Sequence, residues 1–281
     1  MQSATDHYLA LVHRGRNQWW RYVASVLVIL LFAEVLGSIP FLVLARYYDY
    51  SGLRAFLALN LGVLVELAGL TIAVVLIHRR SLLSLITPHA RIDWRRAAQG
   101  FAVWFALDAA ASVIESMLYP GRYRLTFNPD TFFIFAAAAL CLTPLQAATE
   151  ELLFRGYVMQ GLALLVRRPA VIAIASGAIF MLPHLANPEV ASNPLLVPPQ
   201  YLVLGLLLAA VTLRDGRLEL AIGIHTANNL FNGLIANYED SVLTTDAIFT
   251  SRFDPAYALA ALVVASIATY LILFGRRGHP V

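Results

Sequence analysis

Charged residues are scarce in this chain, and their scarcity decides the class of protein. Only 13% of the 281 residues are charged, whereas 59% are hydrophobic, and the mean hydropathy is +0.70. A typical soluble domain carries about twice that share of charge. The composition therefore predicts an all-α, polytopic integral membrane protein that is surrounded by the lipid bilayer.

The chain contains a single cysteine and no lysine. The single cysteine, Cys141, cannot form a disulfide within the chain, and its apolar surroundings predict a buried, unreactive thiol. Lysine is absent, so all 20 basic residues are arginines. The arginines lie in short segments between apolar runs and not on one face of a domain. Nucleic acid is therefore not an expected partner, although the net charge is +3.

The sequence shows no internal repeat, and residues 1–18 lack the pattern of a cleavable signal peptide. Residues 1–18 are polar with scattered arginines, and they contain no short apolar stretch that ends in a small-residue cleavage site. We therefore expect the first apolar run to be retained as a membrane anchor.

Long apolar runs are what the chain has in abundance. Runs of roughly 17 to 25 residues cross the hydrocarbon core of a bilayer, and here they predict about eight transmembrane helices. They cover residues 22–45, 55–77, 97–118, 131 onward, 170–185, 200–213, 218–236 and 256–274. The fifth and sixth runs are short for spans.

The arginines are unevenly divided between the two sides that these spans define. The side opposite to the N-terminus holds only Arg46, Arg54, Arg122, Arg124 and Arg252. Most of the others lie on the side of the N-terminus, and cytoplasmic loops carry the arginine excess. The pattern therefore predicts that both the N-terminus and the C-terminus are cytoplasmic.

The spans group into three regions. Residues 1–130 form an N-terminal membrane region of three spans, residues 131–236 form a core with most of the unusual polar residues, and residues 237–281 hold the last span. The N-terminal region also contains a predicted interfacial segment within 79–99, where apolar Leu85 and Ile86 are followed by Trp94.

The first span of the core contains three ionisable residues in an apolar run, Glu150, Glu151 and Arg155. Such residues are costly inside a membrane unless they are paired or face water, so they indicate a functional site. Residues four apart share a helix face, which predicts an ion pair between Glu151 and Arg155. Glu150 then points elsewhere with a free carboxylate. A carboxylate in apolar surroundings is more basic than in water, so Glu150 is the candidate general base.

Two later spans carry further polar pairs at the same spacing. Phe180 and His184 share a face of the fifth span, and His225 and Asn229 share a face of the seventh. A single histidine in a membrane helix is equally well explained as a packing residue. Several buried polar groups on three spans need partners, and one common internal site explains them together.

In this order, the three groups resemble the signature motifs of the CPBP family of intramembrane proteases. The motifs read Glu150-Glu151-x-x-x-Arg155, Phe180-x-x-x-His184 and His225-x-x-x-Asn229. The family includes type II CAAX prenyl proteases and the bacterial Abi proteins linked to bacteriocin processing and self-immunity. Each motif is weak alone, but the ordered set is specific, and no signature position departs from it. The family core would span 131–236.

The resemblance implies an intramembrane endopeptidase. Glu150 would activate the attacking water with help from His184, and His225 and Asn229 would stabilise the oxyanion. Glu151 and Arg155 would orient the site, and Phe180 would pack against it. The implied substrate is a peptide or protein with a membrane-associated or lipidated, CAAX-like tail. The implied location is a bacterial or archaeal plasma membrane.

Two forms of the chemistry stay open. Glu150, His184 and His225 offer the ligand set of a catalytic zinc site, and the family has often been classed with metallopeptidases. The chain contains no His-Glu-x-x-His sequence, which is the common zinc-protease motif. The resemblance also allows a glutamate-dependent mechanism without metal, which we favour. The predicted cofactor is therefore either none or Zn²⁺.

Two other classes of function are compatible with parts of the sequence. Further acids in the spans, Glu34, Glu66, Asp108 and Glu115, could belong to the proton or cation path of a transporter, although pairing with polar neighbours explains them better. A non-proteolytic immunity or binding protein is the other alternative. The intact set of motif residues argues for the protease over both.

Overall fold

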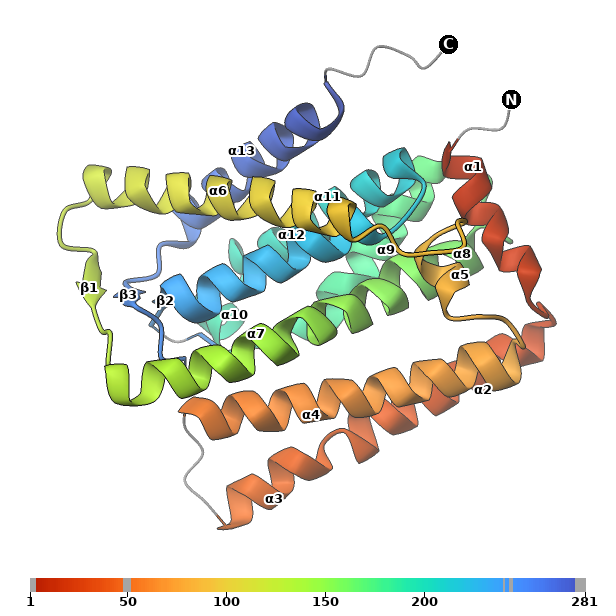
Figure 1. Cartoon of the computed structure of the whole chain (residues 1–281), viewed down its shortest axis with the longest axis horizontal. Helices are drawn as coiled ribbons and strands as arrows, with labels where there is room; N and C mark the ends of the chain where they lie inside the picture. Colours follow the sequence, from red (N-terminus) through yellow and green to blue (C-terminus); the bar gives the residue numbers. More distant parts are fainter. Residues whose placement is uncertain (1–3, 48–51, 240, 243–244, 276–281) are drawn as a thin grey trace.

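The computed structural model describes residues 4–47, 52–239, 241–242 and 245–275, and they form a bundle of helices with one small sheet at its end (Figure 1). The predicted all-α, polytopic class is therefore correct. The C-terminal arginines Arg276 and Arg277, which support the predicted cytoplasmic C-terminus, lie outside the described residues.

All eight apolar runs are helical, but they differ in length. Six helical segments are long and apolar enough to cross a membrane: Trp19–Leu44, Gly52–Ile77, Trp94–Leu118, Pro129–Leu162, Val197–Asp215 and Pro255–Phe274. The fifth run is α9 (Pro169–His184), which is shorter. The seventh is α12 (Glu219–Leu230), extended by the π-helical turn η5 (Phe231–Ile235). The described residues thus support six spans by length, and the count of eight is not established.

Several of the long segments are interrupted by π-helical turns. The first consists of α2 (Trp19–Leu30), η2 (Leu31–Leu36) and α3 (Ile39–Tyr47). The second joins α4 (Gly52–Thr71) to η3 (Ile72–Ile77). The fourth is made of α7 (Pro129–Glu151), η4 (Leu152–Val158) and α8 (Met159–Leu162). Single π-helical turns are often found at functional sites, and η4 directly follows the two glutamates.

The core of the bundle is formed around α12. Figure 1 shows it in the middle of the molecule, with α6 (Trp94–Leu118) above it, α7 below it and α11 (Val197–Asp215) and α9 behind. Most of its side chains are buried, including Leu220, Ile224 and Ala227. Some of its polar side chains, among them Glu219 and His225, are buried as well, which is unusual and indicates that they have partners in the bundle.

The sheet closes one end of the bundle. Its strands are β1 (Tyr123–Leu125), β3 (Phe249–Ser251) and β2 (Ala236–Tyr238), in that spatial order. β3 pairs antiparallel with β1 and parallel with β2. Helix α1 (Ala4–Leu9) lies at the opposite end, whereas α13 (Pro255–Phe274) begins near the sheet and runs away from it (Figure 1).

The apolar part of the predicted interfacial segment packs against protein. It forms the short helix α5 (Leu83–Ile86), in which Leu85 is fully buried. The Tyr8 hydroxyl, which lies on α1 next to η1 (Ala10–Arg14), donates to the Leu85 carbonyl at 2.7 Å. Trp94 is 72% exposed, as an interfacial anchor would be. Apolarity alone could not distinguish the two environments, because both favour apolar side chains.

The prediction that Cys141 is buried is wrong, because its side chain is exposed on α7. Its neighbour Leu140 is likewise exposed, at 58%. In a membrane protein, an apolar run does not imply burial against protein, since the surrounding lipid is as apolar as the core.

Helices α6 and α12 cross with their backbones nearly in contact. A Cβ added to Gly223 would lie 2.0 Å from the Ala97 carbonyl oxygen, and one added to Gly100 would lie 2.3 Å from the Leu220 carbonyl oxygen. Small residues allow such close helix packing in membranes.

We therefore expect Gly223→Ala to destabilise the protein by about 1–3 kcal/mol, since the added methyl group forces the helices apart. Thermal unfolding in detergent would measure the loss. Gly233→Ala is the matched control, because nothing lies within 4 Å of the Cβ added there. Equal melting temperatures for the two variants would contradict the prediction.

Candidate active site

The predicted ion pair is present at the end of α7. Arg155 Nη1 donates to Glu151 Oε1 at 2.7 Å, and neither side chain is exposed. Arg155 Nη2 donates to the Gly205 carbonyl at 3.1 Å, and the guanidinium lies 4.3 Å from the centre of the Phe180 ring. Arg155 is thus fixed by α9 and α11 as well as by its own helix.

Glu151 has a second partner that the helix spacing could not predict. His225 Nδ1 lies 2.8 Å from the same Oε1 that accepts from Arg155. A carboxylate oxygen accepts, so Nδ1 carries the proton of this bond. Glu151 therefore orients the His225 ring and joins α7 to α12.

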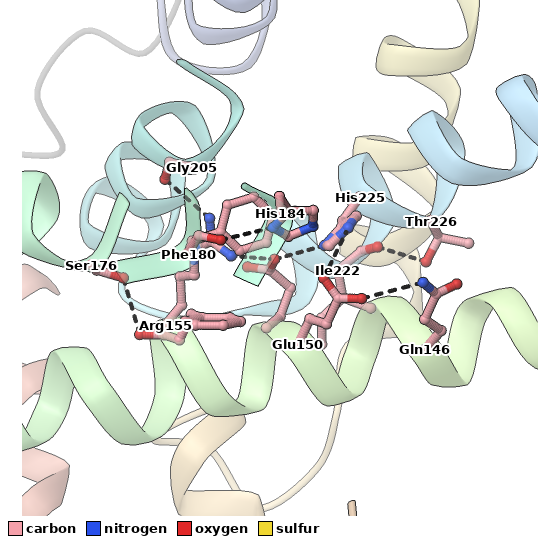
Figure 2. Close-up of polar contacts among 12 residues, drawn as sticks. Gln146, Glu150, Arg155, Ser176, Phe180, His184, Gly205, Ile222, His225 and Thr226 are labelled. Atoms are coloured by element: carbon pink, nitrogen blue, oxygen red, sulfur yellow. Dashed lines mark hydrogen bonds and ion pairs between the residues drawn. The ribbon is translucent and has the colours of Figure 1, made fainter. Parts of the chain in front are cut away.

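Glu150 faces the other nitrogen of the same ring. Figure 2 shows the two side chains pointing toward one another, with 3.8 Å between Glu150 Oε2 and His225 Nε2. Gln146 Nε2 donates to Glu150 Oε1 at 3.3 Å, whereas Oε2 is buried and accepts no hydrogen bond from the described residues. The Glu150 side chain keeps 14% exposure, in contrast to the fully buried Glu151. Its Oε2 thus has unused hydrogen-bonding capacity beside His225.

Phe180 occupies the centre of the site. Its ring centre lies 4.7 Å from that of His184, 5.8 Å from that of His225 and 5.2 Å from that of Phe154. His184 Nδ1 lies 2.8 Å from the Phe180 carbonyl oxygen. A carbonyl only accepts, so Nδ1 carries the proton and Nε2 of the neutral ring is left as an acceptor.

Asn229 lies one helical turn beyond His225 on α12. Its Oδ1 accepts from Asn228 Nδ2 at 3.0 Å, and its own amide N–H groups donate to none of the described residues. Asn228 is itself held by the chain, since its carbonyl accepts from Asn232 Nδ2 at 2.9 Å. Asn229 thus offers an amide donor on the same helix as His225, and no hydrogen bond within the described chain joins it to the residues of the other two motifs.

Sequence reasoning missed several residues that support the site. Gln146 could have been found, because it stands four residues before Glu150 in an apolar run. The Gly205 carbonyl, the Ser176 hydroxyl that donates to the Phe154 carbonyl at 3.1 Å, and Tyr201 could not. These residues reach the site only through the packing of α9 against α11.

The proposed zinc ligands do not form a ligand set in this arrangement. Glu150 and His225 are adjacent, but no group of three His, Cys, Asp or Glu side chains in the described part of the chain is close enough to hold a metal ion. The bond from His225 Nδ1 to Glu151 does not bear on this point, since a metal-bound histidine commonly donates its other N–H to a carboxylate. The donor geometry therefore does not fit a three-ligand zinc ion.

A cavity of about 240 Å³ borders the site without including the motif residues. It lies between α6, α11, α12 and α13 and is lined by both polar and apolar side chains, including Tyr201 and Asn228. These two residues also contact the site, since Tyr201 stacks on His184 and Asn228 holds Asn229. The cavity is thus separated from the motif residues by a single layer of side chains.

The comparisons with known proteins decide the family. The family model described as type II CAAX prenyl endopeptidase Rce1-like matches residues 130–231. The chain is also 30% identical over 244 residues to the uncharacterized protein YyaK of Bacillus subtilis (strain 168), and the match covers 81% of each chain. The chain belongs to the Rce1-like family. No solved structure matches it.

Membership of the Rce1-like family gives the site its general chemistry. The matched residues contain all three motifs, from Glu150 to Asn229. The chain is therefore an integral membrane protein of a protease family, with peptides or proteins as its class of substrate.

Proposed function

We propose that this protein is an intramembrane endopeptidase that hydrolyses a peptide bond by water activated at Glu150. The observation that carries the proposal is the position of Glu150 Oε2, which is buried, has no hydrogen-bond partner among the described residues and faces His225 Nε2 at 3.8 Å. A carboxylate held this way can accept the proton of an attacking water.

The proposed proton path uses Glu150 twice. The water oxygen attacks the carbonyl carbon while one water proton moves to Glu150, and this proton then moves to the leaving nitrogen as the C–N bond breaks. The products are a carboxyl group and an amine. His184 supports the step, because its Nε2 can accept a hydrogen bond from the same water.

His225 and Asn229 are proposed to stabilise the oxyanion. The Asn229 amide is a ready donor. His225 Nδ1 is committed to Glu151, so Nε2 can donate only when the ring is doubly protonated. The carboxylate of Glu151 would stabilise this imidazolium, and preorganised donors in a dry site are the strongest contribution to such a reaction.

The proposed substrate is a peptide or protein with a membrane-associated or lipidated tail. We propose that such a substrate reaches the site, which lies among helices α7, α9 and α12, from the bilayer. We infer a prokaryotic plasma membrane as the location, with both termini in the cytoplasm, from the arginine distribution and the bacterial relative.

A cleavage assay with metal removal tests the proposal. Purified protein in detergent or proteoliposomes would be given membrane-anchored peptides, and the new termini would be identified by mass spectrometry. We expect cleavage to survive strong chelation, because Glu150, His184 and His225 are not grouped as zinc ligands. Stoichiometric metal in the protein, with activity lost on chelation and restored by zinc, would contradict the water mechanism at Glu150. The absence of cleavage for every peptide, with and without zinc, would contradict the protease itself.

A further inference from the structure

The His184 ring is held between two aromatic side chains. Phe180 lies on one side, with ring centres 4.7 Å apart, and Tyr201 stacks on the ring with centres 4.4 Å apart and an interplanar angle of 29°. The hydrogen bond from His184 Nδ1 to the Phe180 carbonyl fixes the rotation of the ring. This hydrogen bond and the stack with Tyr201 together set the direction of Nε2.

Tyr201 is fixed in turn by a buried carboxylate. Its hydroxyl donates to Glu189 Oε1 at 2.6 Å and accepts from Asn187 Nδ2 at 2.9 Å. Glu189 lies on the short helix α10 (Pro188–Ser192), which follows His184 closely in the chain, and it is 1% exposed. The two hydrogen bonds place the Tyr201 ring without freedom to rotate away from His184.

Glu189 also accepts hydrogen bonds from a residue of β2 and from Val242, which follows β2 in the chain. Its Oε2 accepts from the backbone N–H of Val242 at 3.1 Å, and its Oε1 accepts from the Tyr238 hydroxyl at 3.3 Å. Burial, together with the charge of Glu189, raises the pKa of Tyr238 and keeps that hydroxyl protonated as a donor. None of the described arginines forms an ion pair with Glu189. Burying a carboxylate on hydrogen bonds alone is costly, so a role beyond stability is expected for it.

We propose that Tyr201 and Glu189 are positioning residues for His184. Glu189 holds Tyr201 by its hydroxyl, Tyr201 holds the imidazole by stacking, and the imidazole presents Nε2 to the attacking water. This inference rests on the proposed function for its effect on catalysis, but the placement of the ring can be measured independently of cleavage.

Variants of Tyr201 separate the stack from the hydrogen bond. Tyr201→Leu removes both, and we expect kcat to fall about 100-fold with KM changed less than about twofold, since misplacing a catalytic group by about 1 Å has such an effect. Tyr201→Phe keeps the ring but releases it from Glu189, and we expect kcat to fall about tenfold. Glu189→Leu should lower kcat at least as much as Tyr201→Phe, since it also removes the bonds to Tyr238 and Val242. Adding Tyr201→Phe to Glu189→Leu should cost little more, because the bond between the two side chains is then already lost.

The matched control is Tyr257→Phe. Its hydroxyl donates to the Ala111 carbonyl at 2.6 Å, and its ring lines the neighbouring cavity without stacking on His184. We expect its kcat to be that of the wild type. Loss of kcat in proportion to the melting temperature in all these variants, the control included, would overturn the proposal.

The readout that does not depend on cleavage is the NMR spectrum of protein labelled with ¹⁵N-histidine. The His184 ring signals are those lost in His184→Ala. They should shift or broaden in Tyr201→Leu and stay unchanged in Tyr257→Phe. Unchanged His184 signals in Tyr201→Leu would overturn the positioning role whatever the activity, whereas shifted signals in a protein that cleaves nothing would overturn the proposed function alone.

Discussion

Replacing Glu150 by glutamine is expected to lower kcat by about 100- to 10,000-fold, the contribution of a general base. The amide cannot take the proton of the attacking water, although it nearly preserves the shape of the side chain. The melting temperature should change little, because Glu150 has one hydrogen bond, at 3.3 Å from Gln146, and no ion pair with arginine in the described chain. Single-turnover cleavage assays and thermal unfolding of the same preparation would measure both.

The control for this variant is Glu34→Gln, the same substitution at an exposed acid of η2. It tests whether the loss is specific to the site or follows from removing any carboxylate of the spans. We expect wild-type kcat for Glu34→Gln. Full activity in Glu150→Gln, or equal losses in both variants, would remove Glu150 from the mechanism.

Replacing Arg155 by methionine is expected to destabilise the protein by about 3–5 kcal/mol, the effect of breaking a buried ion pair. The change leaves the Glu151 carboxylate fully buried without its cation, and it also frees the Gly205 carbonyl. Methionine fills a similar volume with an apolar chain, so the loss reports on charge and hydrogen bonding more than on packing. Chemical or thermal unfolding in detergent would give the change in the free energy of unfolding.

A double-mutant cycle shows whether the pair accounts for that loss. We expect the Arg155→Met, Glu151→Gln double variant to be more stable than the sum of the single changes predicts, because the neutral amide no longer needs a cation. Arg124→Met is the control, since Arg124 pairs with Glu239 at the sheet, where the side chains are 62% and 42% exposed. Its stability should hardly change, as is usual for exposed pairs. Equal losses in Arg155→Met and Arg124→Met would contradict a structural role for the buried pair.

Several features of this protein could be predicted because they depend on one helix at a time. The apolar runs predicted the helices, since their length and composition are local properties. The Glu151–Arg155 pair follows from the four-residue spacing, which places both residues on one face. The same spacing predicted that Glu150 and Glu151 point in different directions. The predicted pair is present although Arg155 lies in the π-helical turn η4.

Other features were decided only by how the helices pack. The sharing of Glu151 Oε1 between Arg155 and His225, the stacking of Tyr201 on His184 and the burial of Leu85 all depend on contacts between different helices. The outward position of Cys141 is of the same kind. The sequence by itself determined which residues share a helix face, because the backbone repeat is fixed. Which apolar faces meet protein and which meet lipid was decided by the tertiary structure, since both surroundings accept the same side chains.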